Sequence, residues 1–131
     1  MASESSEISL PDRSRSYRLV DFASIVPVAC PCGTARRALA DEPAFPGSLH
    51  LTTIRGAAQP HYHRRLTETY YILSCAPGSR IRLDDDHFEL SPGMAIVIPP
   101  GVVHAVEGEV ELLNIVVPEF DAADEFLVDT E

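Results

Sequence analysis

Three histidines and one glutamate in the middle of the chain combine residue types and spacings that suit metal binding. His61 and His63 are two residues apart, Glu68 comes shortly after them, and His104 follows a Pro-Pro-Gly turn. Side chains two residues apart on a strand leave the same face, so His61 and His63 can converge on one point. Imidazoles plus one carboxylate suit a divalent transition metal and do not suit calcium.

The position of Glu68 requires a break in the strand. An unbroken strand would point Glu68 and His63 to opposite faces, because an odd number of positions separates them. The polar stretch 64–67 allows a turn or bulge that returns Glu68 to the histidines. Tyr70 shares the parity of Glu68, so we expect it to line the same cavity as a candidate catalytic or substrate-binding residue, with an ordinary core position as the alternative.

Two spacing patterns in the chain resemble the two motifs of the cupin superfamily. The first motif runs Gly, a gap, His-x-His, three or four residues and Glu, and it is matched by Gly56, His61, His63 and Glu68. The second runs Gly-x5-Pro-x-Gly-x2-His, and it is matched by Gly93, Pro99, Gly101 and His104. The resemblance covers residues 49–118 and identifies the two histidines of the first motif, its glutamate and the histidine of the second as metal ligands.

Some positions depart from these motifs. The glycine that closes the first motif is displaced to Gly78, and Gly108 stands where the second motif ends in asparagine. Asn114 is too far along the chain to take that position. All four predicted ligands are unaffected.

The resemblance implies an all-β fold, a double-stranded β-helix or jelly-roll barrel, that holds one divalent transition metal. Fe(II) is the favoured ion, with manganese, nickel, zinc and copper as alternatives. Three imidazoles and one carboxylate fill four octahedral positions, so water, dioxygen or a chelating substrate can take the other two. The resemblance also implies a homodimer, and the apolar runs 95–98 and 112–117 agree with it, because both faces of such strands need cover.

This site favours a metal-dependent monocupin that binds a small polar or carboxylate-bearing molecule, with a dioxygenase-type oxygenase as the leading reaction class. A sugar or keto-acid isomerase or epimerase is an alternative, because a metal can also stabilise an enediolate. A non-enzymatic cupin that binds or senses a small ligand is the third hypothesis, since a fold and a metal do not by themselves imply turnover.

The segment 25–37 is a second candidate for ligand binding. Two prolines and a glycine predict that it is an ordered loop. Its thiols, Cys30 and Cys32, and its guanidiniums, Arg36 and Arg37, could clasp an anionic substrate over the barrel mouth, with the arginines binding a carboxylate or phosphate. The alternatives are buried cysteines beside a solvated basic pair, or a C-x-C site for a thiophilic metal of its own.

The length of 131 residues fits one domain. Residues 1–16 have little to bury and predict a mobile N-terminal arm before a single domain at 17–131. A first edge strand is predicted at 17–22. Turns rich in Pro, Gly or Asp then divide the chain into short strands, predicted at 49–54, 60–64, 68–74, 79–84, 86–90, 94–98, 102–106 and 109–117.

The net charge limits which partners the protein can bind, and the cysteine content indicates the redox state of its compartment. The formal net charge of −10 argues against a nucleic-acid backbone as partner, which needs a basic face. Six acids follow Pro118, which leaves 14 of the 20 acidic residues against ten basic ones, so the body can still accept an anionic ligand. This acidic tail either packs through Phe120, Phe126 and Leu127 or is solvated.

Three cysteines, an odd number, give no disulfide framework and favour a reducing compartment. The chain has neither a signal-peptide core nor a run of about 18 apolar residues. The sequence therefore predicts a soluble cytoplasmic protein that engages a small molecule and no membrane. His50 and His87 lie outside the motifs and are predicted to be surface or hydrogen-bonded residues.

Overall fold

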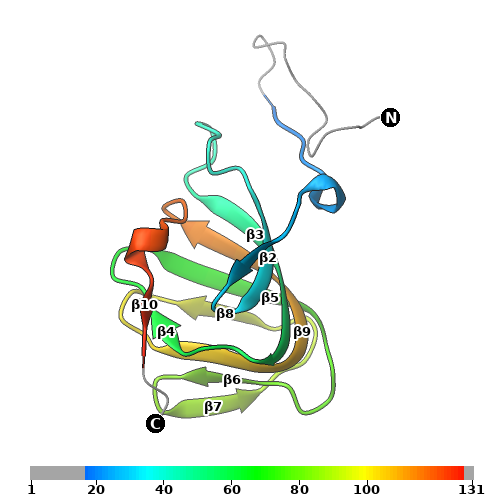
Figure 1. The fold of residues 1–131 in the computed structure, drawn as a ribbon, viewed down its shortest axis with the longest axis vertical. Helices are drawn as coiled ribbons and strands as arrows, with labels where there is room; N and C mark the ends of the chain where they lie inside the picture. Colours follow the sequence, from blue (N-terminus) through cyan, green and yellow to red (C-terminus); the bar gives the residue numbers. More distant parts are fainter. Residues whose placement is uncertain (1–16, 129–131) are drawn as a thin grey trace.

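The computed structural model describes residues 17–128, which form one strongly curled sheet of ten strands (Figure 1). The strands are β1 (Val28–Cys30), β2 (Gly33–Ala38), β3 (Ser48–Ala57), β4 (His61–Tyr62), β5 (Thr67–Cys75), β6 (Arg80–Leu83), β7 (Asp86–Glu89), β8 (Ala95–Ile98), β9 (His104–Val117) and β10 (Phe126–Leu127). Two single-turn 3-10 helices, η1 (Phe22–Ser24) and η2 (Ala122–Asp124), lie near the two ends. The predicted all-β jelly-roll barrel is confirmed, while the predicted arm at 1–16 lies outside the described residues.

The long strand β9 is the spine of the sheet. It pairs antiparallel with β3 along one edge, and with β5 and then β6 along the other. The sequence predicted two strands here, separated near Gly108, and that prediction is wrong because glycine lets the strand continue. Gly108 has a φ of +118° and lies so close to Ser79 that a Cβ would collide with the serine side chain.

Side chains alternate between the interior of the barrel and its surface. Along most of β3 and β5, residues with more buried side chains alternate with less buried ones, as expected of strands with one face in the core. The apolar end of the interior contains Ile54, Ile72, Ile81, Leu90, Ile98, Val106, Val110 and Leu112. Full burial of each such side chain contributes about 1.5–3 kcal/mol to folding.

The polar end of the interior has a different composition. Its buried polar residues are Ser48, His50, Thr52, His61, His63, Glu68, His104 and Asn114. Tyr70 lies at the boundary, because it belongs to the apolar cluster and its hydroxyl reaches Glu68. The shared cavity expected for Tyr70 and Glu68 is therefore present.

The N-terminal part differs from the sequence prediction. Residues 17–22 contain one isolated bridge rather than an edge strand, and the segment predicted as a loop holds the β1–β2 hairpin. Two prolines do not prevent this pairing, because Pro27 precedes β1 and Pro31 lies in the turn, where neither removes a hydrogen bond of the ladder. The strands predicted between residues 49 and 98 are all present, with shifts at their ends.

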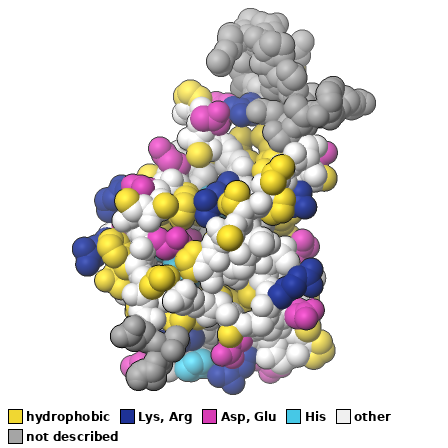
Figure 2. Space-filling model, in the orientation of Figure 1, with side chains coloured by type: hydrophobic (Ala, Val, Ile, Leu, Met, Phe, Trp, Pro, Cys, Tyr) yellow, Lys and Arg dark blue, Asp and Glu magenta, His cyan; other side chains and the backbone are white. Residues whose placement is uncertain are grey.

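The surface mixes apolar and charged side chains. Figure 2 shows hydrophobic, acidic and basic side chains interspersed over one face of the molecule. The exposed large apolar residues include Tyr71, Leu73 and Val97 on β5 and β8, and these side chains point away from the interior. Among residues 17–128, no helix is long and apolar enough to cross a membrane.

Candidate metal centre

Three segments bring the four predicted ligands together at the polar end. His61 lies on β4 with His63 just after it, Glu68 is near the start of β5, and β9 begins at His104. His61 pairs directly with His104 across β4 and β9. One nitrogen or carboxylate oxygen from each of the four residues lies within 4.8 Å of the others, and all four residues are buried. The break between β4 and β5 returns Glu68 to the histidines, as the spacing predicts.

Backbone carbonyls fix the rings of His61 and His104. The Nδ1 atom of His61 lies 2.9 Å from the carbonyl oxygen of Gln59, and Nδ1 of His104 lies 2.9 Å from that of Val102. A carbonyl oxygen only accepts, so each ring donates its Nδ1–H there, and a neutral ring keeps its lone pair on Nε2. A hydrogen bond of this kind is how proteins orient a histidine that presents Nε2 to a metal.

The contact between His104 and Glu68 requires a cation. Nε2 of His104 is 2.9 Å from Oε1 of Glu68, a distance at which a lone pair and a carboxylate oxygen repel each other. A proton on Nε2, or a metal ion bound to both atoms, removes that repulsion. Two atoms that each lie about 2.1 Å from one ion are about 3.0 Å apart when they bind at right angles, so the contact fits two neighbouring ligands.

Glu68 is held as a carboxylate. Burial alone would raise its pKa, but the hydrogen bond and charge of His104, the charge of His63 and a 2.9 Å hydrogen bond from Nδ2 of Asn114 lower that pKa to about 2. The Asn114 amide binds Oε2, which leaves Oε1 to face the histidines. Tyr70 donates to Oε1 at 3.4 Å, and burial together with the Glu68 charge raises the pKa of Tyr70 well above its usual value.

His63 has a ring nitrogen that makes no hydrogen bond. Its Nδ1 is 3.8 Å from Oε1 of Glu68, while its Nε2 is buried without a hydrogen-bond partner. Burial alone would lower the pKa of His63, but the carboxylates of Glu125 and Glu68 raise it. Burial, reinforced by His104, lowers the pKa of His61. A buried nitrogen without a hydrogen bond is costly, and a metal ion would satisfy it, so these residues fit the divalent transition metal that the fold implies.

Arg36, one of the two arginines predicted to bind substrate, holds the N-terminal segment against β2. Its Nη1 donates to the carbonyl oxygens of Phe22, Ala23 and Ile25, at 3.2, 3.3 and 2.7 Å. Because Nη1 is bound to these backbone acceptors and Arg36 does not line the cleft of the metal ligands, its substrate-binding role stays a prediction without structural support.

Arg37, the other arginine, lines a narrow cleft that also includes His61, Glu68 and Tyr70. Its guanidinium carbon lies 4.1 Å from the centre of the Phe120 ring, and its Nε is buried without a hydrogen-bond partner. Burial lowers the pKa of Arg37, although a nearby carboxylate partly offsets this. Arg37 therefore brings an incompletely partnered positive charge to the cleft that contains the metal ligands.

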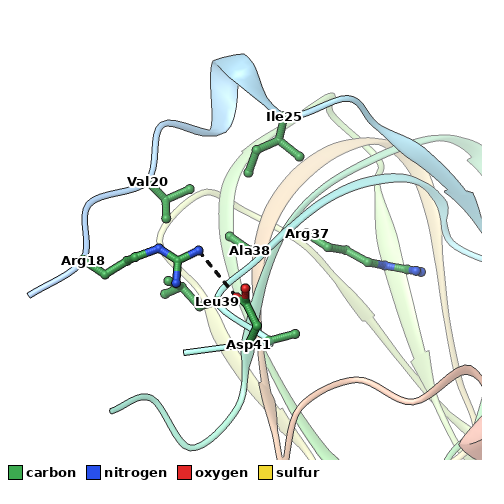
Figure 3. Close-up of a pocket in the computed structure, with 8 residues that line it drawn as sticks. Arg18, Val20, Ile25, Arg37, Ala38, Leu39 and Asp41 are labelled. Carbon is green, nitrogen blue, oxygen red and sulfur yellow. Dashed lines mark hydrogen bonds and ion pairs between the residues drawn. The ribbon is translucent and has the colours of Figure 1, made fainter. Parts of the chain in front are cut away.

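A larger cavity lies outside the metal centre. Its volume is about 250 Å³, and its lining comes from the N-terminal segment, β2 and the residues after β2. Figure 3 shows the ion pair of Arg18 with Asp41, 3.5 Å long, at this cavity, and shows the Arg37 side chain extending away from it. The narrow cleft is the better candidate for chemistry, because it is the one lined by predicted metal ligands.

Cys30 and Cys32 form a disulfide across the β1–β2 turn, while Cys75 is free. The prediction that the cysteines form no disulfide is therefore wrong for this pair, whose Cα atoms the tight turn holds 5.1 Å apart. The disulfide leaves no thiols for a substrate clasp or for a C-x-C metal site. It also removes the basis on which the cysteines favoured a reducing compartment.

Three residues of this region were not predicted to take part. Asn114 binds Glu68, His50 lines the cleft, and Glu125 lies 3.6 Å from Nε2 of His63. Asn114 did carry a signal, because it is the polar exception in the apolar run 112–117. Glu125 carried none, since it lies in an acidic tail whose local pattern equally fits a solvated surface. The packing alternative for that tail is confirmed for Phe120 and Phe126, which contact Arg37 and Arg64, whereas Leu127 is exposed.

Comparisons with known proteins agree with this geometry. A family model described as a cupin domain matches residues 50–116. The crystal structure of a protein from Planctomyces limnophilus is 41% identical, with a TM-score of 0.80, and the match covers 84% of this chain and 96% of that one. A comparison with curated proteins finds no match.

Two more distant structures show the fold alone. Ectoine synthase from P. lautus is 14% identical with a TM-score of 0.70, over 88% of this chain and 92% of that one. A variant of Streptomyces PAC13 with uridine is 17% identical with a TM-score of 0.70, over 82% of this chain and 88% of that one. PAC13 is described as a nucleoside dehydratase. Proteins with different reactions therefore share this barrel, and the function has to be argued from the site.

Proposed function

Because this chain belongs to the cupin family, we propose that it is a metal-dependent monocupin that binds a small carboxylate-bearing molecule and oxidises it with dioxygen. The observation that carries the metal centre is the contact of His104 with Glu68. Nε2 of His104 faces Oε1 of Glu68 at 2.9 Å, although Nδ1 of the same ring already donates to a carbonyl oxygen. A divalent ion shared with His61 and His63 would satisfy all four side chains.

Fe(II) is the ion we favour for this centre, with manganese, nickel, zinc and copper as alternatives. A bound Fe(II) would supply Lewis acidity and one-electron chemistry with dioxygen. The four side chains leave two octahedral positions for small molecules. Their burial keeps bulk water from the donor atoms, and the hydrogen bonds to Gln59 and Val102 hold two of the imidazoles in place before any ligand binds.

Arg37 supplies the charge that a carboxylate-bearing ligand needs. It lines the same cleft as the metal ligands and has an unpartnered Nε. A guanidinium binds a carboxylate through two parallel N–H donors, a geometry that lysine does not reproduce. We expect Arg37 to hold the carboxylate of the ligand while the reacting end of the ligand approaches the metal ligands.

Tyr70 holds a proton beside the centre. Its raised pKa keeps the phenol protonated at neutral pH, so the side chain acts as a hydrogen-bond donor rather than as a base. The 3.4 Å bond to Glu68 is long for a hydroxyl donor, so little is lost when the hydroxyl turns to a bound molecule. Tyr70 would thereby orient the ligand, the role that makes it a candidate catalytic and substrate-binding residue.

Isomerisation or epimerisation of a sugar or keto acid is a second candidate reaction, because groups that can carry protons without oxidation lie at the centre. The Tyr70 hydroxyl is one, and the Glu125 carboxylate, 3.6 Å from Nε2 of His63, is another. An acid and a base placed beside a substrate suffice to move a proton between neighbouring carbons.

Metal analysis and oxygen uptake test this function together. Protein purified without added metal should contain iron in equimolar amount, and an oxygen electrode should record uptake that depends on one of a panel of small carboxylates. Arg37→Lys should raise KM for that carboxylate more than it lowers kcat, whereas Arg80→Lys, at an exposed site on β6, should behave as wild type. Turnover of a sugar or keto acid without oxygen would favour the isomerase. Failure to bind metal after supplementation would refute the metal centre.

A further inference from the structure

The carboxylate of Glu125 reaches the metal centre from the C-terminal end of the chain. Its Oε2 lies 3.6 Å from Nε2 of His63 and 3.9 Å from Nε2 of His61. The residue sits between η2 and β10, outside the segment 50–116 that matches the cupin domain. Its side chain is 16% exposed, so the carboxylate is largely withdrawn from water and faces two of the four predicted ligands.

A buried neighbour anchors Glu125 on its N-terminal side. The Asp124 carboxylate accepts hydrogen bonds from the backbone amides of Arg64, Arg65 and Leu66, at 2.9, 2.9 and 3.1 Å. These amides lie in the break between β4 and β5. The same break brings the predicted ligands together, so the C-terminal segment is attached directly to the part of the chain that forms the centre.

Strand β10 anchors Glu125 on its C-terminal side. β10 pairs with β4, and Figure 1 shows the two strands side by side. The Phe126 ring stacks on Tyr62 with centroids 5.4 Å apart and lies 4.2 Å from the guanidinium carbon of Arg64. The amide of Val128 donates to the carbonyl oxygen of Pro60 at 2.9 Å. Anchors on both sides hold the Glu125 carboxylate at the centre and limit its entropic cost of binding.

The distances of Glu125 from His61 and His63, together with its charge, suit an ion shared with these histidines. Two atoms that each lie about 2.1 Å from one ion are about 3.0 Å apart at right angles and about 4.2 Å apart when opposite. The separations of 3.6 and 3.9 Å from His63 and His61 fall between these limits. A doubly charged ion bound by three neutral imidazoles and Glu68 keeps one positive charge, and Glu125 neutralises it, which matters because an uncompensated buried charge is costly.

We propose that Glu125 is a fifth protein ligand of the metal in the substrate-free protein, which makes the segment 121–128 part of the metal site. The inference rests on the metal centre of the proposed function. With Glu125 bound, one octahedral position stays open instead of two. A chelating substrate must then displace the Glu125 carboxylate, whereas a molecule that binds through one atom need not.

The affinity of full-length protein for Zn²⁺, measured by competition with a chelator, tests the role of Glu125. Glu125→Gln preserves the size of the side chain and removes its charge, and we expect it to weaken Zn²⁺ binding by about 10- to 100-fold. Glu119→Gln changes an exposed glutamate of the same tail and should bind Zn²⁺ as wild type does. Unchanged circular dichroism of the metal-free variants would show that both keep the fold.

Hydrogen exchange gives a second readout that does not depend on activity. Zn²⁺ should slow exchange of the backbone amides of residues 126–128 in wild type and in Glu119→Gln, and should do so much less in Glu125→Gln, because the variant loses the link between the ion and this segment. Wild-type affinity and wild-type protection in Glu125→Gln would overturn the inference.

His104→Ala separates failure of this inference from failure of the proposed function. If His104→Ala loses Zn²⁺ binding while Glu125→Gln binds as wild type, the four-residue centre stands and the role of Glu125 is wrong. If His104→Ala also keeps wild-type affinity, the metal centre itself is wrong, and the fifth ligand is refuted with it.

Discussion

The two ends of the barrel interior are built from the same strands and differ in composition. On β3, Ser48, His50 and Thr52 line the polar end, and Ile54 continues the same inward face into the apolar end. On β5, Glu68 gives way to Ile72 in the same manner. The strand geometry is shared, so the residue types at alternate positions alone decide which end of a strand stabilises the fold and which end can bind.

The polar end depends on partners that the apolar end does not need. Aliphatic side chains are stabilised by burial itself, whereas a buried polar group must find a hydrogen bond. In the described part of the chain, the buried side-chain atoms without a hydrogen-bond partner belong to Arg37, His63 and Asn114. All three residues lie at the polar end or in its cleft. The unused hydrogen-bonding and coordinating capacity of the barrel is therefore concentrated where a metal and a ligand are expected.

Register explains how the polar end is assembled. Arg37 on β2 lies opposite His50 on β3, His50 lies opposite Asn114 on β9, and Asn114 lies opposite Tyr70 on β5. One row across the curled sheet thus carries four polar side chains. They are the guanidinium of Arg37, the buried imidazole of His50, the amide of Asn114 that binds Glu68 and the phenol of Tyr70. A shift of one residue in any pair would turn that part of the row to the outer face.

Removal of a ligand at the polar end should have the largest effect. His104→Ala removes the imidazole that faces Glu68, and we expect Zn²⁺ affinity to fall by at least about 1000-fold, which is about 4 kcal/mol. Circular dichroism should be largely unchanged, because the apolar end is untouched. Chelator competition measures the affinity, and a His104→Ala protein that retains metal through dialysis would contradict the site.

A substitution that leaves a cavity at the apolar end should have the opposite effect, because it should lower stability and leave metal affinity nearly unchanged. Leu112 is fully buried, and Leu112→Ala should lower the free energy of unfolding by about 3 kcal/mol through lost contacts and the space left behind. Zn²⁺ affinity of the folded variant should stay within about threefold of wild type, because its site is at the other end. Denaturant unfolding and chelator competition together test this separation. A loss of metal affinity as large as that of His104→Ala would show that the two ends are coupled.

His50 should make the polar end sensitive to acid. The Ser48 hydroxyl accepts a hydrogen bond from the Phe120 amide and lies 2.8 Å from Nε2 of His50, which holds the buried ring in place. Burial and the charge of Arg37 lower the pKa of His50 to about 4. Between about pH 6.5 and pH 4, the unfolded chain binds a proton that the folded chain refuses, so the free energy of unfolding falls as pH falls, by up to about 3 kcal/mol.

Comparison with His50→Gln isolates this contribution. At pH 7 wild type should be the more stable protein, and the difference in free energy of unfolding between the two should shrink as the pH is lowered to about 4.5. Denaturant unfolding of metal-free protein at several pH values measures it, and the contributions of other titrating groups cancel in the difference. A gap that does not change with pH would mean that His50 is protonated as easily in the folded chain as in the unfolded one.

The sequence predicts those parts of the molecule that are encoded by local patterns or by motif spacing. Alternation and turn residues locate most strands, and the two motifs identify side chains that meet although Glu68 and His104 are 36 residues apart. The β1–β2 hairpin was missed because Pro and Gly were taken to prevent pairing, while in the structure the prolines lie just outside the strands. The disulfide was missed because an odd number of cysteines was taken to exclude a disulfide framework.

Contacts of the C-terminal segment lie beyond sequence reasoning for a physical reason. Asp124 binds the backbone of Arg64, 60 residues earlier, through a carboxylate that no local pattern distinguishes from its solvated neighbours. Arg36 and Arg37 illustrate the same limit. These adjacent residues have the same chemistry but point to opposite sides of β2. The packing of η1 decides that Arg36 donates to backbone carbonyl oxygens while Arg37 lines the cleft.

Substitutions on the outer face of the sheet should have the smallest effect on both ends of the interior. They also test the predicted homodimer. Val97, at the centre of the edge strand β8, is 62% exposed, with Tyr71 on the neighbouring strand also exposed. Val97→Glu should change the free energy of unfolding by less than about 0.5 kcal/mol in the monomer, but it should dissociate a dimer that covers this face. Gel filtration with light scattering should then give a dimer mass for wild type and for Phe88→Glu, an exposed control on β7, and a monomer mass for Val97→Glu. A monomeric wild type would contradict the homodimer, and a dimeric Val97→Glu would place the interface on another face.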